Sequence, residues 1–158
     1  MAIQIVLNLI AAVAWMLFQN SFTFVDFVIG YIIGIVALFL ARPLLGYTFY
    51  MRRVVAAIKL FLLFLKELVV ANIDVLKVVL SPKLNVSSSI IAVPTQLETK
   101  GEITLLAVLI TLTPGTLSMD FSDDSQTIYI HALDAPDREQ FIKDIQQTFE
   151  RAIMEVTR

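Results

Sequence analysis

The segment TLTPGTLS at residues 111–118 places four hydroxyl side chains around a Pro-Gly pair and directly follows an apolar run. Hydroxyls and a glycine could cradle a phosphate, but phosphate sites use the backbone N–H groups at the start of a helix. This loop follows the end of the apolar run and contains no Lys. Pro114 cannot extend a helix, and Gly115 accepts a positive φ that other residues resist. A chain reversal from helix into strand is therefore favoured over a ligand site.

Few other residues could carry chemistry. Lys66 and Glu67 are adjacent charges inside a long apolar segment, where such a pair marks an intramembrane or interfacial site. His131 is the only histidine, and one imidazole without convergent ligands makes a poor metal site. The acidic residues near position 122 lack the Gly and the final Glu of a calcium loop. Because the sequence also contains no Cys, it predicts no enzyme, no metal centre and no cofactor.

The elements that must position these residues begin with a strongly apolar N-terminal region. The chain of 158 residues is 58% hydrophobic with a mean hydropathy of +0.80, whereas soluble domains are about 45–50% apolar. Asp26 is the only ionisable side chain in residues 1–41, and QNSFTF at residues 19–24 interrupts the run. Spanning helices need about 17–25 apolar residues. We therefore predict transmembrane helices at about residues 3–18 and 22–41, which form a hairpin rather than a cleaved signal peptide.

The distribution of Lys and Arg predicts the orientation of this hairpin. Its turn contains neither residue, while Arg42, Arg52 and Arg53 follow the second span. Cytoplasmic ends of membrane helices are enriched in Lys and Arg. We expect a multi-pass protein of the cell membrane, with the N-terminus and the C-terminal domain in the cytoplasm. Pro43 predicts the end of the second helix.

A third apolar segment, at about residues 52–80, carries regularly spaced charges. Arg52, Lys59 and Lys66 are separated by steps of seven, as are Glu67 and Asp74, and this spacing gathers them on one stripe of a helix. Two interpretations remain open. The segment is either a long amphipathic helix in the cytoplasmic interface or a third spanning helix in which Lys66 and Glu67 form a functional pair. The second interpretation would place the C-terminal half outside the cell.

Residues 81–158 are predicted to form a small domain with the order β-α-β-β-α, after a polar linker at residues 81–89. A strand at 90–97 contains Pro94, which indicates an edge position. Thr99 and Glu102 match a capping box ahead of a short helix at 103–113. Alternating residues around 119–121 and 128–130 predict a β-hairpin. A final amphipathic helix has one apolar face, formed by Phe141, Ile145, Phe149, Ile153 and Val156. The predicted class is thus an α+β membrane protein.

The two halves of the chain differ in charge. Residues 1–80 contain 6 basic and 3 acidic side chains, whereas residues 81–158 contain 6 basic and 11 acidic ones. An acidic domain without a basic, aromatic-rich patch argues against nucleic acid as a partner. A domain of under 80 residues also has a marginal core, so docking on the membrane region or on a partner would help to stabilise it.

The segment TLTPGTLS, placed after a short apolar helix and before MDF and IYIHALD, resembles the signature of the E subunit of Mrp-type (also called Mnh) multisubunit Na+(K+)/H+ antiporters. The resemblance extends over the whole chain, from the hairpin with Trp15 and the proline after it to the α/β tail. It implies a subunit of a hetero-oligomeric membrane complex. Large antiporter-like subunits of such a complex carry the proton and cation path, and the E subunit is needed for assembly or activity.

The resemblance also singles out Thr113, Pro114, Gly115 and Thr116, which match the motif and are expected to be functionally sensitive. Pro114 and Gly115 would set the shape of the loop, and the two threonines would offer hydroxyls to a partner or to the backbone.

Two functions of different class follow from the sequence. The first is an accessory membrane subunit of a multisubunit monovalent cation/proton antiporter, in contact with other antiporter subunits and with the lipid bilayer. The alternative is a free-standing, membrane-anchored binding or sensory module whose α/β domain recognises a small molecule or a soluble protein. The first predicts a protein that is unstable alone, and the second a separately soluble domain.

Overall fold

The chain forms two units, Met1–Val54 and Val55–Arg158. The structure is a computed structural model that describes residues 2–45, 49–83 and 86–158, with the backbone alone for residues 42–45. Residues 84–85 of the predicted linker and the side chains of Arg42 and Pro43 lie outside the described residues.

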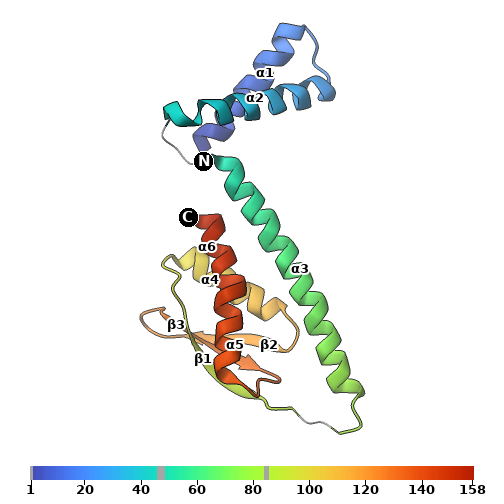
Figure 1. The fold of residues 1–158 in the computed structure, drawn as a ribbon, viewed down its shortest axis with the longest axis vertical. Coiled ribbons are helices and arrows are strands. Elements are labelled where there is room, and N and C mark those ends of the chain that lie inside the picture. The colour runs from blue at the N-terminus through green and yellow to red at the C-terminus, as the bar shows by residue number, and fades with distance from the viewer. Residues whose placement is uncertain (1, 46–48, 84–85) are drawn as a thin grey trace. The chain divides into compact units, whose positions relative to one another are not determined.

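The apolar N-terminal sequence forms two helices, α1 (Ala2–Gln19) and α2 (Phe24–Leu45) (Figure 1). Both are long and apolar enough to cross a membrane, as the predicted spans at 3–18 and 22–41 require. Asn20 has a left-handed φ of 50°, which a short polar side chain tolerates and which reverses the chain between the helices. The α2 helix continues two residues beyond Pro43 to Leu45. The proline removes a single backbone donor, and only the last turn depends on that donor.

The next helix, α3 (Tyr50–Leu80), has 31 residues, which is about 46 Å at the rise of an α-helix. From Val55 onward it belongs to the second unit, where Leu60, Leu63 and Phe64 pack against the core. The opposite side of α3 is also apolar, but it is exposed; it includes Ile58, Leu62, Leu65, Val69, Ile73 and Leu76. The apolar residues of this helix are thus divided between a packed face and an open face.

The α/β domain contains a three-stranded antiparallel sheet with the strand order β1-β3-β2. The strands are β1 (Ser89–Pro94), β2 (Thr116–Phe121) and β3 (Thr127–Ala132). Pro94 ends the edge strand β1, where its missing N–H leaves the pairing intact. The predicted β2–β3 hairpin is confirmed, and a bulge lies between Ser118 and Asp120.

Two helical segments cover one face of this sheet. The first, α4 (Lys100–Leu112), begins with the predicted capping box. Thr99 Oγ1 accepts the N–H of Glu102 at 3.2 Å, and the Glu102 carboxylate accepts the N–H of Thr99 at 2.9 Å. The second is one helical stretch built from α5 (Arg138–Ile145), the π-helical turn η1 (Gln146–Glu150) and α6 (Arg151–Thr157). The predicted order β-α-β-β-α is therefore confirmed.

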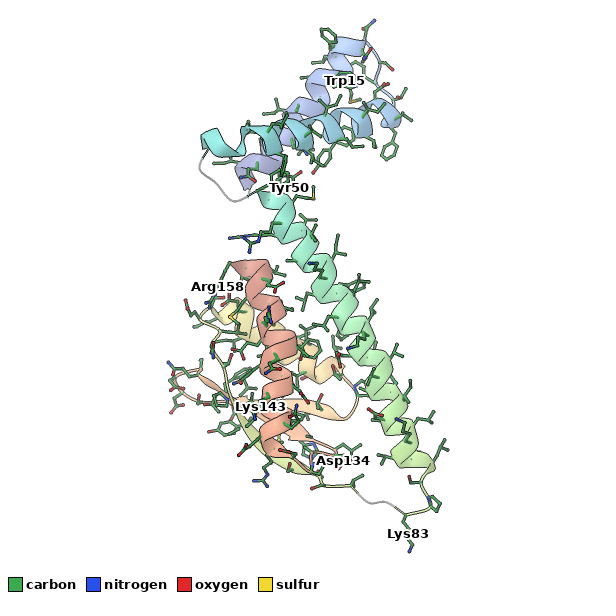
Figure 2. The ribbon with its side chains drawn as sticks, in the orientation of Figure 1. Trp15, Tyr50, Lys83, Asp134, Lys143 and Arg158 are labelled. Carbon is green, nitrogen blue, oxygen red and sulfur yellow. The ribbon has the colours of Figure 1, made fainter. Side chains whose placement is uncertain are left out.

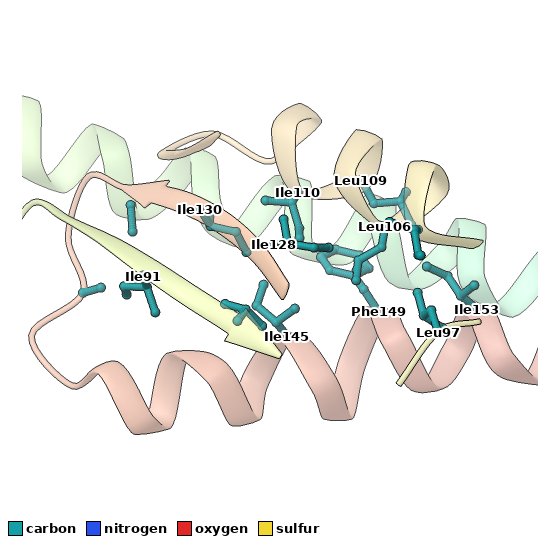
Figure 3. Packing of buried hydrophobic residues seen from close by; sticks show 14 of the residues in the cluster. Ile91, Leu97, Leu106, Leu109, Ile110, Ile128, Ile130, Ile145, Phe149 and Ile153 are labelled. Atoms are coloured by element: carbon teal, nitrogen blue, oxygen red, sulfur yellow. The ribbon is translucent and has the colours of Figure 1, made fainter. Parts of the chain in front are cut away.

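The core of the second unit lies between the sheet and these helices (Figure 3). Its largest fully buried apolar side chains are Leu106, Ile110, Ile128, Ile130, Ile153 and Val93. The predicted apolar face of the last helix is confirmed at Ile145, Phe149 and Ile153, which are buried, and at Phe141 and Val156, which pack against the cluster while partly exposed. This core fixes the end of α4 against the sheet, and so positions the loop between them.

Candidate functional site

The segment TLTPGTLS joins α4 to β2. After Leu112 the chain leaves the helix, and Thr113 is extended with φ −85° and ψ 120°, as the residue before a proline prefers. Gly115 has a φ of +89°, a conformation that glycine adopts without strain. Its carbonyl accepts the N–H of Leu133 at 2.8 Å, which ties the loop to the residue after β3. The predicted reversal from helix to strand is confirmed.

The two threonines of the loop cap the C-terminal end of α4. Thr113 Oγ1 donates to the carbonyl of Leu109 at 2.8 Å, and Thr116 Oγ1 donates to the carbonyl of Ile110 at 2.6 Å. Thr116 Oγ1 also lies 3.0 Å from the carbonyl of Thr113. The last four carbonyls of a helix have no partner inside it. The hydroxyls therefore serve the backbone, which is one of the two uses that the sequence left open.

The remaining hydroxyls of the segment join β2 to α4. Ser118 Oγ donates to the carbonyl of Ala107 at 3.2 Å, and Thr111 Oγ1 accepts the N–H of Ser118 at 3.3 Å. Since Ser118 lies on the edge strand β2, its outward N–H would otherwise be open to pairing with another strand. The motif thus supplies hydrogen-bond partners both to the end of α4 and to the adjoining part of the sheet edge.

The loop also lies against α3 within the second unit. A Cβ built on Gly115 would lie 3.4 Å from Cγ2 of Val75 on α3 and 3.8 Å from Cβ of Leu133. The glycine therefore combines a positive φ with a close approach to a neighbouring helix, and a side chain at this position would meet both constraints.

Thr113 and Thr116 line two open grooves, one between the loop and α3 and the other between the loop, α3 and the last helical stretch. One groove, of about 430 Å³, includes Asp74 and Lys77, which pair with each other at 2.7 Å. The other, of about 370 Å³, includes Glu67. The first groove also includes Asp134, whose Oδ1 accepts the N–H of Ser87 at 2.9 Å, so each of its charged side chains has a partner within the chain. The loop therefore packs between α3 and the rest of the domain.

The predicted pair Lys66–Glu67 lies on α3. Lys66 Nζ is 3.1 Å from Glu67 Oε1, and the side chains are 70% and 25% exposed. Ion pairs of this kind at a surface contribute little, about 0–1 kcal/mol. Glu67 and the motif threonines border the same groove, so the two predicted sites are neighbours. Their functional roles stay predictions.

A buried polar cluster in the first unit was not predicted from the sequence. Asn8 is fully buried, and its Nδ2 donates to Tyr50 Oη at 2.9 Å. Gln4 Oε1 accepts the N–H of Tyr50 at 2.8 Å, and Tyr50 Oη lies 3.4 Å from Tyr31 Oη; Figure 2 labels Tyr50 at the start of α3. Polar groups inside an apolar helical pair require partners. The signal was present, because Gln4 and Asn8 are one turn apart in an otherwise apolar helix.

Two glycines of α2 were missed as well. A Cβ on Gly30 would lie 2.9 Å from both Cα and the carbonyl oxygen of Ala12, and a Cβ on Gly34 would overlap Asn8 Oδ1. Glycines four residues apart let two membrane helices approach closely. The sequence contains this pattern as GYIIG at residues 30–34. Because neither glycine has a side chain, α1 packs directly on the backbone of α2.

The carboxylates of the domain have structural partners. The hydroxyl of Thr157, with the N–H of Thr99, lowers the pKa of Glu102 to about 2. A hydrogen bond from the Ser122 hydroxyl lowers the pKa of Asp124 in the β2–β3 turn. Over residues 2–45, 49–83 and 86–158, no three His, Cys, Asp or Glu side chains are grouped to hold a metal ion. These carboxylates stabilise a helix start and a turn.

These features define a class of membrane protein, in which a helical hairpin precedes a long helix and a small α/β domain. The sequence matches the family described as "Na+/H+ ion antiporter subunit" over residues 8–156. It is 63% identical to the E subunit of the Na+/H+ antiporter of Alkalihalophilus pseudofirmus and 49% identical to that of Bacillus subtilis, each over 100% of both chains. The chain belongs to the family of Na+/H+ antiporter E subunits, as the resemblance of TLTPGTLS implied.

Two solved structures contain chains of similar fold. The chain resembles one in the membrane-bound sulfane sulfur reductase, an archaeal respiratory membrane complex, with a TM-score of 0.56 and 25% identity over 95% of this chain and 96% of that one. It shares its fold with a chain of the Mrp complex from a Dietzia species, with a TM-score of 0.50 and 24% identity over 62% of this chain and 92% of that one. Both neighbours are chains of membrane complexes.

Proposed function

We propose that the protein is an accessory subunit of a multisubunit monovalent cation/proton antiporter and is needed for the assembly or the activity of that complex. The observation that carries the proposal is the full-length similarity to Na+/H+ antiporter E subunits, at 63% identity for one relative. In this proposal the other subunits carry the proton and the cation. The protein itself works through packing and not through catalysis.

The ionisable residues of the hairpin support an accessory role. An ion path through a bilayer needs ionisable side chains at membrane depth that face a cavity. Residues 1–41 contain a single Asp, Glu, Lys, Arg or His, which is Asp26, and it lies in the first turn of α2. Its carboxylate accepts hydrogen bonds from Ser21 Oγ at 2.6 Å and Thr23 Oγ1 at 2.5 Å. These contacts are those of a helix start beside a turn.

We infer that the domain and the N-terminus are cytoplasmic and that α3 lies in the cytoplasmic interface of the cell membrane. Arg42, Arg52 and Arg53 follow the second span, and the hairpin turn has no Lys or Arg. One face of α3 packs on the domain core through Leu60 and Phe64. A helix that carries a charged domain along one side cannot cross a bilayer while that packing persists, since each charge at the centre costs about 2.5–3.5 kcal/mol.

In this arrangement the exposed apolar face of α3, which includes Leu62, Val69 and Leu76, enters the lipid. Lys59 and Lys66 lie to one side of that face by their spacing. They would contact anionic headgroups, and each would contribute about 1 kcal/mol to membrane binding. The loop at residues 113–116 then holds this membrane helix to the domain. That role accounts for the expected sensitivity of Thr113, Pro114, Gly115 and Thr116.

Everted membrane vesicles test the accessory function. Cells that express all other subunits of the complex would be prepared with and without this chain, and a fluorescent ΔpH probe would report the proton movement that added Na+ or K+ drives. We expect cation-driven proton movement only in vesicles that contain the chain. Equal movement in its absence would contradict the proposal.

Labelling of introduced cysteines tests the orientation. The chain has no Cys, so a single Cys at Asn20 in the turn or at Lys143 in the domain reports its position without background. A membrane-impermeant maleimide added to intact cells should label the turn position and should label Lys143→Cys only after lysis. Labelling of Lys143→Cys in intact cells would place the domain outside and would overturn the inferred topology.

A further inference from the structure

The second face of the domain's sheet is exposed and carries apolar side chains beside His131 and Asp120. We call this surface the open sheet face; it includes Ile90, Ala92, Leu117, Tyr129 and His131. The side chains of Ile90, Leu117 and Tyr129 are 56%, 47% and 39% exposed. An antiparallel sheet with one solvated face normally carries polar residues there. Contiguous exposed apolar side chains of this kind mark an interaction surface.

The strand register makes the open sheet face continuous. His131 on the central strand β3 is paired with Ile90 on β1 and with Leu117 on β2. In the next row of the same face, Tyr129 is paired with Ala92 and with Asp120. Side chains directly opposite each other on neighbouring strands lie about 4.5–5.5 Å apart at Cβ. The apolar residues therefore form one patch that crosses all three strands.

The border of this patch is acidic. Asp120 belongs to the face itself, and Asp123 and Asp124 form the adjoining turn between β2 and β3. None of the three strands contains Lys or Arg. The half of the chain that forms the domain has 6 basic and 11 acidic side chains. A partner that fits the open sheet face is therefore apolar at its centre and basic at its rim.

We propose that the open sheet face docks a cytoplasmic loop of a polytopic subunit of the same complex, with apolar residues at the contact and Lys or Arg beside it. The proposal rests on the proposed function, because it requires the complex and the cytoplasmic location of the domain. Cytoplasmic loops of multi-pass membrane proteins carry an excess of Lys and Arg. Such a loop thus supplies the charge that the acidic border of this face requires.

The same charge argument separates this occupant from two others. A lipid surface would bring anionic headgroups against Asp120, Asp123 and Asp124. A second copy of the chain, paired through the same face, would oppose two acidic borders, and like charges across an interface cost affinity. The basic loop is the occupant that the sign of the charge favours.

Site-specific photocrosslinking in the whole complex tests the proposal. A benzoylphenylalanine in place of Tyr129 puts an aromatic probe at the centre of the face. After illumination of membranes that contain all subunits, the tagged chain is purified in a mild detergent, and the crosslinked peptides and the co-purifying proteins are identified by mass. We expect a crosslink to a Lys- or Arg-rich cytoplasmic loop of a polytopic antiporter subunit.

Two matched variants measure the contributions to docking. Leu117→Glu puts an acid on the open sheet face, and Val108→Glu makes a comparable change on α4, where Val108 is 45% exposed. We expect Leu117→Glu to lower the crosslink yield about fivefold or more, which corresponds to about 1 kcal/mol. We expect Val108→Glu to leave the yield unchanged. Asp123→Lys should lower it too, because it reverses one charge of the border.

The outcomes distinguish this inference from the proposed function. If antiporter subunits co-purify but the probe crosslinks to lipid, to a second copy, to a soluble protein or to nothing, the docking inference is wrong and the proposed function stands. If no antiporter subunit co-purifies, the proposed function fails and the inference fails with it. Equal loss of yield in Leu117→Glu and Val108→Glu would also overturn the assignment to this face.

Discussion

Replacing Gly30 by Ala should separate the two membrane helices. The added Cβ would lie 2.8 Å from Cβ of Trp15 and 2.9 Å from Cα and the carbonyl oxygen of Ala12. Carbon atoms pack at about 3.5–4.0 Å, so α1 must move away by about 1 Å. Backbone atoms cannot relieve this contact by changing rotamer. The helices must shift as bodies, which also strains the hydrogen bond from Asn8 to Tyr50.

The cost of this change follows from the general effect of overpacking, about 1–3 kcal/mol. That range corresponds to a change of about 5- to 150-fold in the ratio of closed to open hairpin. In a chain of this size each kcal/mol lowers the unfolding temperature by about 2–4 °C. Gly34→Ala should cost less, because its closest contact is Asn8 Oδ1, and a side-chain amide can rotate.

The assay is the thermal stability of the detergent-purified chain, with the amount of the chain in membranes as a second readout. Gly101→Ala is the matched control. Gly101 lies in α4, and a Cβ there meets no atom within 4 Å, so the same substitution should be neutral or stabilising by up to about 1 kcal/mol. An unfolding temperature for Gly30→Ala equal to that of Gly101→Ala would refute the close approach of α1 and α2.

Three further predictions concern the domain and the hairpin turn. Thr116→Val removes the hydroxyl that caps the carbonyl of Ile110. Because that carbonyl keeps the N–H of Thr113 as a donor at 3.1 Å, the domain should lose about 0.5–1.5 kcal/mol, and Thr116→Ser should restore most of the loss. Thermal unfolding of both variants checks this, and parental stability in the Val variant would contradict it. The pKa of Glu102 is lowered from 4.5 to about 2 by the hydroxyl of Thr157 and by backbone N–H groups, so its contribution is present above about pH 4.5 and is lost as the pH falls toward 2. Glu102→Gln should therefore flatten the dependence of unfolding temperature on pH in that window, and an unchanged slope would show that this carboxylate is not the cause. Asp26→Asn should leave cation-driven proton movement in vesicles intact, and a loss of movement at normal abundance would assign the residue to the ion path.

The sequence predicted the elements of the domain well, because their signals are local. Thr99 and Glu102 fix the start of α4 through neighbouring atoms, and the alternation of Ile128 and Ile130 fixes the buried face of β3. The predicted strand at 90–97 ends earlier, at Pro94, although the N–H of Thr95 still donates to the carbonyl of Gln126 at 2.8 Å. Leu97 is buried in the core although it lies beyond the end of the strand, so its apolar side chain indicated burial and not strand structure.

The contacts between distant residues could not be predicted in the same way. That the Thr116 hydroxyl caps Ile110 depends on the path of the loop, which spacing alone does not give. The sequence likewise showed a wide apolar surface on α3, but it could not tell which residues pack on the domain and which remain exposed. Only the fold assigns Leu60 to the core and Leu62 to the open side. By contrast, the spacing of Gly30 and Gly34 is a local signal, and the close approach of α1 and α2 could have been predicted from it.

Purification of the full chain from native membranes in a mild detergent, through a C-terminal tag, tests whether the protein is a subunit of an antiporter complex. We expect large polytopic antiporter subunits to co-purify in fixed stoichiometry and Gly30→Ala to lower their yield. Recovery of a lone, monodisperse protein of 17.7 kDa from cells that express the whole complex would contradict the account.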